Sequence, residues 1–542
     1  MWTFRHKLGE LLAKITGKQL QNDVKRPSVE DLRPNKHTAA PEQGIEKSPP
    51  KKQPETHHPQ SRPTKQNEAQ SPVTLVSKAA QKGRPAYFFQ IGFDFGTSTS
   101  KAVVRDINTD RAWVYTVPSA TGISTFLIPS VVICHDGQFE RHLDAEMLYP
   151  EGGLYHLKMA IEKIARDNVN DSLFEEYKKI LGVTSQYDSR KIAKLACIYF
   201  LASAFSDIIR SIIKKFPGYG QNLDDQMAIN MAIPVANISD HNTRHLFEKI
   251  LNTAWMFAWQ FDSTQKSLPI DELAQKVENY EADLRKQGKS ERCQVYPEVS
   301  ANVQAFVRSP ASSPDMRTIY FFSDAGAGTV DQSVFTYAGR EDRQLNYFSA
   351  GVFPRGSSQI EITACGETIN ENCLEYWRKE KEQGKNSPIL NHAKMIIGEA
   401  LKTDTEKTLR DTLACLPFGE GISPRSTLEK NIKFIFSGGG HTEFPYQNAV
   451  VSAYKNFLQT GQDPIVTSIA KPDDMDVPKG CEHWLNRLYV AYGLSFLHFE
   501  LAENTFPSEN RLSQPEASIV RPCSCRGFNK NCSKCFGTGV IQ

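Results

Sequence analysis

The sequence predicts an α/β protein, because short apolar segments typical of strands alternate with longer segments of helical periodicity. Two features carry this prediction. Three apolar runs each lead into a glycine-containing turn, in "FFQIGFDFG", "TIYFFSDAGAG" and "NIKFIFSGGG". The segment "SRKIAKLACIYFLASAFSDIIRSIIKKF" keeps a helical apolar period along its length, which predicts a long buried helix.

The individual elements follow in chain order. We expect two strands joined by a tight turn over "FFQIGFDFG" and "SKAVVRD", and a further strand over "IPSVVICHDG". The segment "MAINMAIPV" predicts a strand that ends at Pro234, followed by a helix whose N-cap is Ser239 or Asp240. A second strand–turn–strand unit is expected over "TIYFFSDAGAGTVDQSVFTY". Residues 262–296 are polar with one helical stretch, and they predict a surface insertion.

The proportions of hydrophobic and charged residues are typical of a soluble globular protein. The 542 residues carry a formal net charge of +2, which gives no general attraction to nucleic acid or membrane, and no specific nucleic-acid binding is evident. We expect no membrane span, because we judge no apolar run to be as long as the roughly 18 residues that such a span needs. The N-terminus has no uninterrupted apolar region of the signal-peptide kind, so we expect a cytoplasmic protein.

The first 85 residues divide into two parts. Residues 1–19 have apolar side chains at helical spacing with basic residues between them, so they predict an amphipathic helix. Such a helix can lie on a membrane surface, dock on a partner, or pack on its own protein. Residues 20–85 are rich in Pro, Lys, Gln, Glu and Ser, which predicts a disordered linker.

Two Asp–Gly turns carry the chemistry. The stretch "DFGTSTS" begins at Asp94, and "DAGAGTVD" runs from Asp324 to Asp331. A Walker A loop and a dinucleotide fingerprint are both excluded by the glycine spacing. Turns rich in backbone N–H groups and hydroxyls can hold phosphate, and an aspartate at the strand end can hold hydrated Mg²⁺. The alternative is that each turn is a plain hairpin. In this interpretation Lys101 is only the start of the next strand.

These motifs resemble a known superfamily. "IGFDFGTSTSKAVV", "FFSDAGAGTVDQSVF" and "FIFSGGGHTEFP" resemble the two phosphate motifs and the adenosine motif of the actin–Hsp70–sugar kinase superfamily, and within it the Hsp70 nucleotide-binding domain. "LKMAI", "MAIPVANISDHNTR", "VYPEVSANVQAF" and "YVAYGLSF" continue the resemblance in the same order. It covers about residues 87–500, so it implies a two-lobed actin-like ATPase domain over residues 86–502.

The resemblance also implies site roles. The catalytic group would be Asp94, Lys158, Glu298, Asp324 and Asp331. The two aspartates at the strand ends would hold Mg²⁺ through water, and the lysine would neutralise developing phosphate charge. The phosphates and the adenosine of ATP or ADP would be held by Gly96, Thr97, Ser98, Gly326, Gly328, Thr329, Gly439 and Gly440. A solvated helix lysine and a surface carboxylate remain the alternatives for Lys158 and Glu298.

The sequence departs from the family at three positions. Ala327 stands where members usually have glycine, His441 stands at a usual serine, and Glu443 replaces the arginine that stacks on adenine. The family's Glu–Lys adenine clamp is not visible in "AKMIIGEALKTDTEKTL". The phosphate residues match the family pattern, whereas the contacts to the base do not.

The C-terminal segment predicts a zinc site. Residues 503–522 are expected to be a linker, and residues 523–542 contain Cys523, Cys525, Cys532 and Cys535 in a C-x-C-x6-C-x-x-C pattern. Four thiolates in so short a span favour a structural tetrahedral Zn²⁺ site, with free or redox-active thiols as the alternative. "CSKCFGTG" resembles the C-x-x-C-x-G-x-G unit of the DnaJ cysteine-rich domain, which implies docking of a protein partner or client.

Together these features predict a Mg²⁺-dependent ATPase that acts as a molecular switch. The resemblance covers no peptide-binding β-sandwich, so we do not expect a self-contained chaperone. Three alternatives stay open: a nucleotide-sensing scaffold with weak catalysis, an actin-like filament protein, and a small-molecule kinase of the same superfamily.

Overall fold

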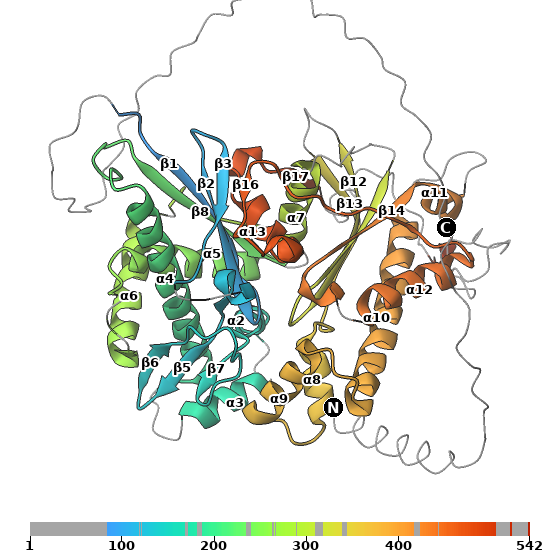
Figure 1. Cartoon of the computed structure of the whole chain (residues 1–542), viewed down its shortest axis with the longest axis horizontal. Helices are drawn as coiled ribbons and strands as arrows, with labels where there is room; N and C mark the ends of the chain where they lie inside the picture. The colour runs from blue at the N-terminus through green and yellow to red at the C-terminus, as the bar shows by residue number, and fades with distance from the viewer. Residues whose placement is uncertain are drawn as a thin grey trace, which may run out of the picture. The chain divides into compact units, whose positions relative to one another are not determined.

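The computed structural model describes residues 84–118, 120, 122–167, 172–181, 187–234, 240–262, 265, 267–288, 290–308, 318–338, 344–416, 423–442, 444–505, 521–522 and 540–541 (Figure 1). The predicted N-terminal helix and almost all of the predicted linker lie outside these residues, as do the four C-terminal cysteines. Within the described part, helices and several sheets confirm the α/β prediction.

The first sheet contains seven strands in the order β10-β8-β1-β2-β3-β16, with β4 paired to β2. Strands β1, β2 and β3 are antiparallel neighbours, whereas β8 and β10 extend the sheet in parallel. The bounds are β1 (Phe88–Asp94), β2 (Thr99–Asp106), β3 (Arg111–Val114), β4 (Ile128–Pro129), β8 (Gln226–Ile233), β10 (Cys293–Pro297) and β16 (Met475–Asp476).

The second sheet repeats this arrangement. Its six strands have the order β15-β14-β11-β12-β13-β17, in which β11, β12 and β13 are antiparallel and β14 and β15 are parallel additions. In both sheets the first strand therefore lies between its own hairpin partner and a later parallel strand. The bounds are β11 (Ile319–Ala325), β12 (Val330–Ala338), β13 (Gln344–Phe353), β14 (Ile432–Ser437), β15 (Ile465–Val466) and β17 (Glu503–Thr505).

A smaller sheet of four strands has the order β7-β5-β6-β9, with bounds β5 (Val132–His135), β6 (Gln138–Arg141), β7 (Gly153–Leu154) and β9 (Ser267–Pro269). Its presence corrects one prediction. The segment "IPSVVICHDG" forms two strands in different sheets rather than one, because β4 pairs with β2 whereas β5 pairs with β6 and β7.

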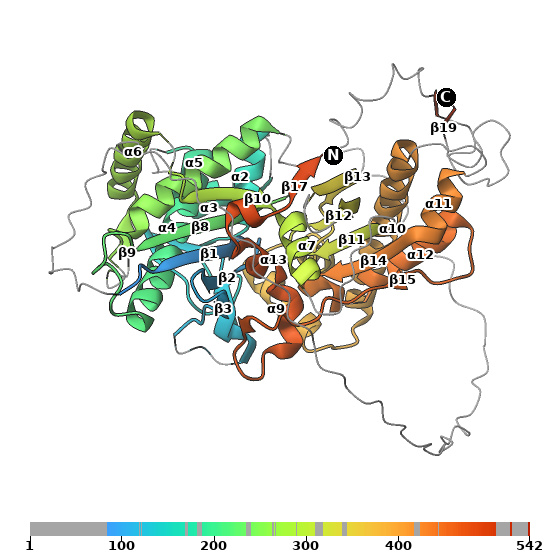
Figure 2. The ribbon, with the colours of Figure 1, turned by 90° about the horizontal axis from the view of Figure 1, so that it is seen from above.

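Helices pack on both faces of the large sheets, and the longest ones lie on the outer faces (Figures 1 and 2). Side chains of α4 and α5 pack with β1 and β8, while α10 and α12 pack with β11 and β14. The bounds of the helices are α2 (Leu157–Ala165), α3 (Ser172–Leu181), α4 (Ser189–Lys215), α5 (His241–Ala258), α6 (Ile270–Gln287), α7 (Glu298–Arg308), α8 (Ser358–Cys365), α9 (Glu371–Glu382), α10 (Pro388–Cys415), α11 (Pro424–Asn431), α12 (Tyr446–Leu458) and α13 (Tyr489–Leu494).

Two of these helices match their predictions closely. Helix α4 is the long buried helix expected from the apolar period. It is long and apolar enough to cross a membrane, contrary to the judgement made from the sequence, but 89% of its most apolar window is buried inside the fold. Helix α5 begins after Asp240, whose side chain accepts a hydrogen bond from the backbone N–H of Asn242 as an N-cap.

Helices α7 and α13 lie between the two large sheets, and glycine permits their close contact (Figures 1 and 2). A β-carbon on Gly493 of α13 would lie 1.9 Å from the carbonyl oxygen of Ala301 in α7. One on Gly92 of β1 would lie 2.0 Å from the carbonyl oxygen of Ala491. Helix α7 packs on the second sheet through Val299 and Val303, so the crossing connects the two sheets.

The range 262–296 differs from the expected surface insertion. Strand β10 pairs with β8 inside the first sheet, and α6 buries Leu273 and Val277 in the same core as α4 and α5. The polar outer face of α6 dominates the composition of this range, which hides its apolar stripe. The predicted linker also starts too early, because β17 pairs with β13.

Candidate functional site

A cavity of about 350 Å³ is lined by residues of both large sheets. This volume is within the range of sites for small molecules. The predicted residues that line it are Asp94, Gly96, Thr97, Ser98, Lys158, Glu298, Asp324, Gly326, Thr329, Asp331, Gly439 and Gly440. The structure therefore brings together residues that are more than 300 positions apart in the sequence.

The two Asp–Gly turns meet at this cavity. Each turn closes a hairpin, since the N–H of Gly96 donates to the carbonyl of Asp94 at 3.1 Å and that of Gly326 donates to Thr329 at 2.9 Å. Gly328 does not line the cavity, but it lies where the turns contact each other. A β-carbon there would be 2.7 Å from Oγ1 of Thr97, so a larger residue would push the turns apart.

A third turn, after β14, completes this wall. Gly438 has a φ of +82°, which favours glycine, and a β-carbon would lie 2.2 Å from Oδ1 of Asp324. Gly439 is less restricted, because a β-carbon would lie 2.7 Å from the guanidinium carbon of Arg487, which is the end of a flexible side chain. The third turn and the carboxylate of Asp324 can therefore approach one another only because Gly438 lacks a side chain.

Lys158 and Glu298 form a buried ion pair at the cavity. Lys158 lies in the first turn of α2 and Glu298 is the first residue of α7, with exposed fractions of 5% and 9%. Burial lowers the pKa of Lys158, but the carboxylates of Glu298, Glu162 and Asp331 raise it above its ordinary value. The lysine is therefore a fixed cation, and neither residue is the solvated surface group considered as the alternative.

Two further carboxyl groups face each other across β11 and β12, where Asp324 and Asp331 are register partners. Burial, together with the nearby carboxylates of Glu298 and Asp94, raises the pKa of Asp324 to about 7. Burial and Glu298 also raise the pKa of Asp331 well above its ordinary value. Oδ1 of Asp331 is buried and finds no hydrogen-bond partner among the described residues. This part of the wall therefore holds two buried carboxyl groups whose ionised form is disfavoured.

Two residues of the site were missed or misjudged from the sequence. Lys101 is more than the start of β2, because its ammonium group donates to Asp94 at 3.1 Å and lines the cavity. Its position follows from the hairpin register, in which Asp94 and Lys101 are paired. Asn302 donates to Oδ2 of Asp324 at 2.6 Å. The four-residue spacing from Glu298 to Asn302 on a helix was the signal that could have found it.

The side of the cavity near Gly439 and Gly440 has its own set of polar and aromatic residues. Thr442, Trp484, Asn486 and Arg487 line it, the last three lying on or beside the 3₁₀ turn Glu482–Arg487. The Arg487 guanidinium lies 5.0 Å from the centre of the Trp484 ring. Helix α10 contains the segment "AKMIIGEALKTDTEKTL", in which the family's adenine clamp was not visible. Among the described residues, none of those that line the cavity comes from this helix.

The structure places two of the three residues at which the sequence departs from the family pattern. The His441 ring is not among the groups lining the cavity; it packs 4.8 Å from the Phe436 ring, and burial lowers its pKa to about 3. Glu443 lies outside the described residues. Ala327 lines the cavity, and its carbonyl would contact any β-carbon placed on Gly356.

The sequence predicts two metal sites, one for Mg²⁺ at the cavity and one for Zn²⁺ near the C-terminus. Among the described residues, no group of three or more His, Cys, Asp and Glu side chains is close enough to ligate a metal directly. Cys523, Cys525, Cys532 and Cys535 lie outside the described residues. The short strands β18 (Arg521–Pro522) and β19 (Val540–Ile541) pair antiparallel and bring the two ends of their segment together.

No protein-family model matches the chain, and no curated protein matches its sequence.

Proposed function

We propose that the chain is an Hsp70-like ATPase that binds ATP with Mg²⁺ in this cavity and hydrolyses it slowly as a molecular switch. The observation that carries the proposal is the meeting of two Asp–Gly hairpin turns at one cavity, beside a buried lysine. Backbone N–H groups and hydroxyls from two opposed turns can hold a chain of phosphates from both sides.

The fold supports the same proposal. Two sheets with the same strand order, connected by the crossing of α7 and α13, fit the two-lobed actin-like arrangement that the sequence motifs resemble. A nucleotide held by turns from both sheets has different contacts when the sheets move apart. Its binding would therefore shift the equilibrium between open and closed arrangements.

The charges of the wall fit a divalent cation. Among the described residues no ion pair involves Asp324 or Asp331, and burial together with the nearby carboxylate of Glu298 raises the pKa of both carboxyls. In the proposal Asp94 and Asp324 hold the hydrated metal, and the buried Oδ1 of Asp331 accepts from a water in the same shell. Bound Mg²⁺ would neutralise charge on the phosphate oxygens.

The other residues of the site would stabilise charge, orient water and contact the nucleobase. Lys158 is held by Glu298 as a fixed cation beside the phosphates, where it stabilises charge that develops during transfer. Glu298 and Asp331 orient the attacking water, and Asn302 keeps Asp324 in place. Near Gly439, Trp484 and Arg487 offer flat groups on which a nucleobase can stack.

We further propose a cytoplasmic protein that acts on protein partners through its terminal segments. The four cysteines after Pro522 would form a closed structural Zn²⁺ site, and the pairing of β18 with β19 brings the two ends of the cysteine-containing segment together. The basic amphipathic segment 1–19 offers a second contact for a partner or a membrane surface.

Phosphate release from ATP by the purified protein tests the proposal, with Asp324→Asn as the matched variant. Slow Mg²⁺-dependent release that the variant abolishes supports the switch. Nucleotide binding without release would instead favour a scaffold. Release only with an added hydroxylated metabolite would favour a kinase, and polymer that pellets on ATP addition would favour a filament protein.

A further inference from the structure

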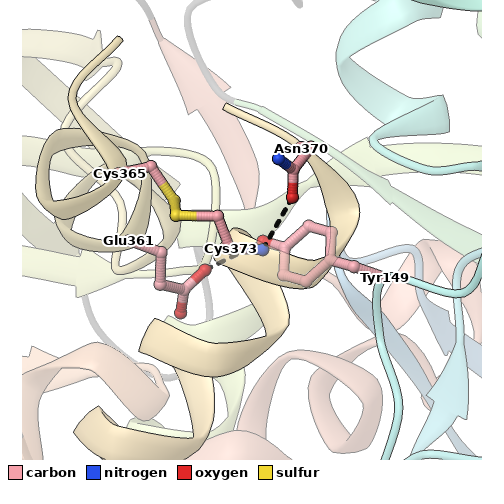
Figure 3. Close-up of a disulfide and its surroundings, with 5 residues drawn as sticks. All are labelled: Tyr149, Glu361, Cys365, Asn370 and Cys373. Atoms are coloured by element: carbon pink, nitrogen blue, oxygen red, sulfur yellow. Dashed lines mark hydrogen bonds between the residues drawn. A yellow bond between two sulfur atoms is a disulfide. The ribbon is translucent and has the colours of Figure 1, made fainter. Parts of the chain in front are cut away.

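A disulfide beside the cavity is a candidate site of reversible redox modification (Figure 3). It joins Cys365, the last residue of α8, to Cys373, in the first turn of α9. The turn between them, residues 366–370, is exposed, and Cys373 is half-buried. A small thiol reductant can therefore reach the bond from solvent.

The two joined helices contribute charged residues to the cavity wall: Glu361 comes from α8, and Arg378 and Lys381 come from α9. The ammonium group of Lys381 donates to Oε1 of Glu361 at 2.5 Å and to the carbonyl of Ser357 at 3.1 Å. The disulfide thus fixes one end of the α8–α9 pair, and this polar contact fixes the other.

The same pair of helices contacts the segment that precedes β7. The hydroxyl of Tyr149 donates to Oε2 of Glu361 at 2.9 Å, and the N–H of Leu148 donates to Oε2 of Glu375 at 3.2 Å. Arg378 donates to the carbonyl of Glu146. We call these contacts between residues 146–149 and α8–α9 the latch.

Apolar packing connects the disulfide directly to the latch. Cys365, Leu374, Tyr149 and Tyr155 belong to one buried cluster, against which Cys373 also packs. Figure 3 shows Tyr149 and Glu361 close to the disulfide. Residues 146–149 lie between β6 and β7 of the small sheet, whereas α8 follows β13 of the second sheet. The latch therefore joins two parts of the fold that are far apart in the sequence and that both line the cavity.

We propose that reduction of the Cys365–Cys373 disulfide by a dithiol opens the latch and speeds the release of bound nucleotide. A reductant thiolate attacks one cysteine sulfur, the S–S bond breaks, and the other cysteine leaves as a thiolate that takes up a proton. The second reductant thiol then resolves the mixed disulfide. Two electrons and two protons pass to the protein, and the reductant becomes a disulfide. Disulfides that occur in cytosolic proteins are usually catalytic or redox-sensing, which suits this role.

Reduction should move α9 without unfolding it. The helix start is capped by Asn370, whose Oδ1 accepts from the N–H of Cys373 at 2.9 Å, and this bond involves no sulfur (Figure 3). What reduction removes is the covalent restraint between α8 and α9. The expected change is therefore a looser contact with residues 146–149.

The test compares the full-length protein in its oxidised form and after treatment with dithiothreitol. Release of a fluorescent ADP should become at least about fivefold faster on reduction, the lower end of typical coupling between sites. The double variant C365S/C373S should release at the fast rate in both conditions, whereas Cys415→Ser, a partly exposed free cysteine, should respond like wild type. Equal release rates, with reduction of the bond verified by mass spectrometry, would overturn the proposal.

Because this inference rests on the proposed nucleotide function, hydrogen exchange provides an independent readout. Faster exchange in residues 144–149 and 358–382 on reduction is expected with or without nucleotide. If no nucleotide binds in either state, the proposed function fails while the opening of the latch is still measured. Unchanged exchange in both segments would refute the latch itself.

Discussion

Lys158 and Glu298 form a buried ion pair that joins α2 to the first residue of α7, across 140 positions of the sequence. Both residues line the cavity that the two Asp–Gly turns share. Helix α7 packs on the second sheet, whereas α2 packs in the core of the first. The pair therefore holds a cation at the point where both halves of the proposed phosphate clamp meet.

Replacing Lys158 should cost both stability and catalysis. Lys158→Met leaves Glu298 buried without its partner, which typically destabilises a protein by roughly 3–5 kcal/mol. The double variant Lys158→Met/Glu298→Gln should recover most of that loss, because no uncompensated charge remains in the pair. Hydrolysis of ATP should fall at least about 100-fold in both variants. Urea unfolding and phosphate release measure the two effects; equal stability of the single and double variants would contradict the assigned pairing.

The carboxyl of Asp324 predicts a specific pH dependence for the protein without metal. Its pKa rises from 3.8 to about 7 on folding, so the folded state holds this proton more tightly than the unfolded state. The carboxyl therefore costs no stability below about pH 4, and its cost grows as the pH rises to about 7. In EDTA, Asp324→Asn should stabilise the protein at pH 8 by about two to three times as much as at pH 5.

Asparagine is a suitable replacement because its carbonyl can still accept the hydrogen bond from Asn302. Urea unfolding at the two pH values measures the difference. Added Mg²⁺ should stabilise the wild type more at pH 8 than at pH 5, because the cation requires the ionised carboxylate. The same gain from Asp324→Asn at both pH values would mean that this carboxyl is not desolvated.

Gly438 should tolerate no side chain. Alanine there adopts an unfavourable positive φ and places its β-carbon 2.2 Å from Oδ1 of Asp324. We expect Gly438→Ala to lose about 1–3 kcal/mol of stability and to lose nucleotide binding, because Asp324 must move. Gly461→Ala is the matched control, since nothing lies within 4 Å of its β-carbon. Thermal unfolding and nucleotide titration of both variants decide the question; equivalent behaviour would remove the third turn from the site.

The C-terminal cysteines should hold one zinc ion per chain. Elemental analysis of the full-length protein should find zinc at about one equivalent, as expected for a single four-thiolate site. A variant ending at Pro522 should contain none. Retention of zinc by that shorter chain would show that the metal lies elsewhere.

The parts of the site that sequence reasoning located are those defined by local chemistry. Asp94 and Asp324 each follow an apolar strand and precede a glycine turn, so both the residue and its position at the strand end were visible. Lys158 and Glu298 came from the resemblance to Hsp70, and periodicity alone would not have selected them.

What escaped prediction depends on contacts between distant segments. The role of Lys101 follows from the register of one hairpin, and that of Asn302 follows from the packing of α7 beside β11. The hydrogen bond from Tyr149 to Glu361 spans 212 positions, and no local pattern announces it. Strand β10 was hidden because its apolar residues follow a long polar stretch, whose composition suggested an insertion.

The most direct test of the account is a calorimetric titration of the purified full-length protein with ATP, in Mg²⁺ and again in EDTA. The account predicts one bound nucleotide per chain in Mg²⁺ and an affinity at least roughly tenfold lower in EDTA, a difference of about 1.4 kcal/mol. Absence of binding at millimolar ATP in both conditions would contradict it, as would an affinity that is the same with and without Mg²⁺.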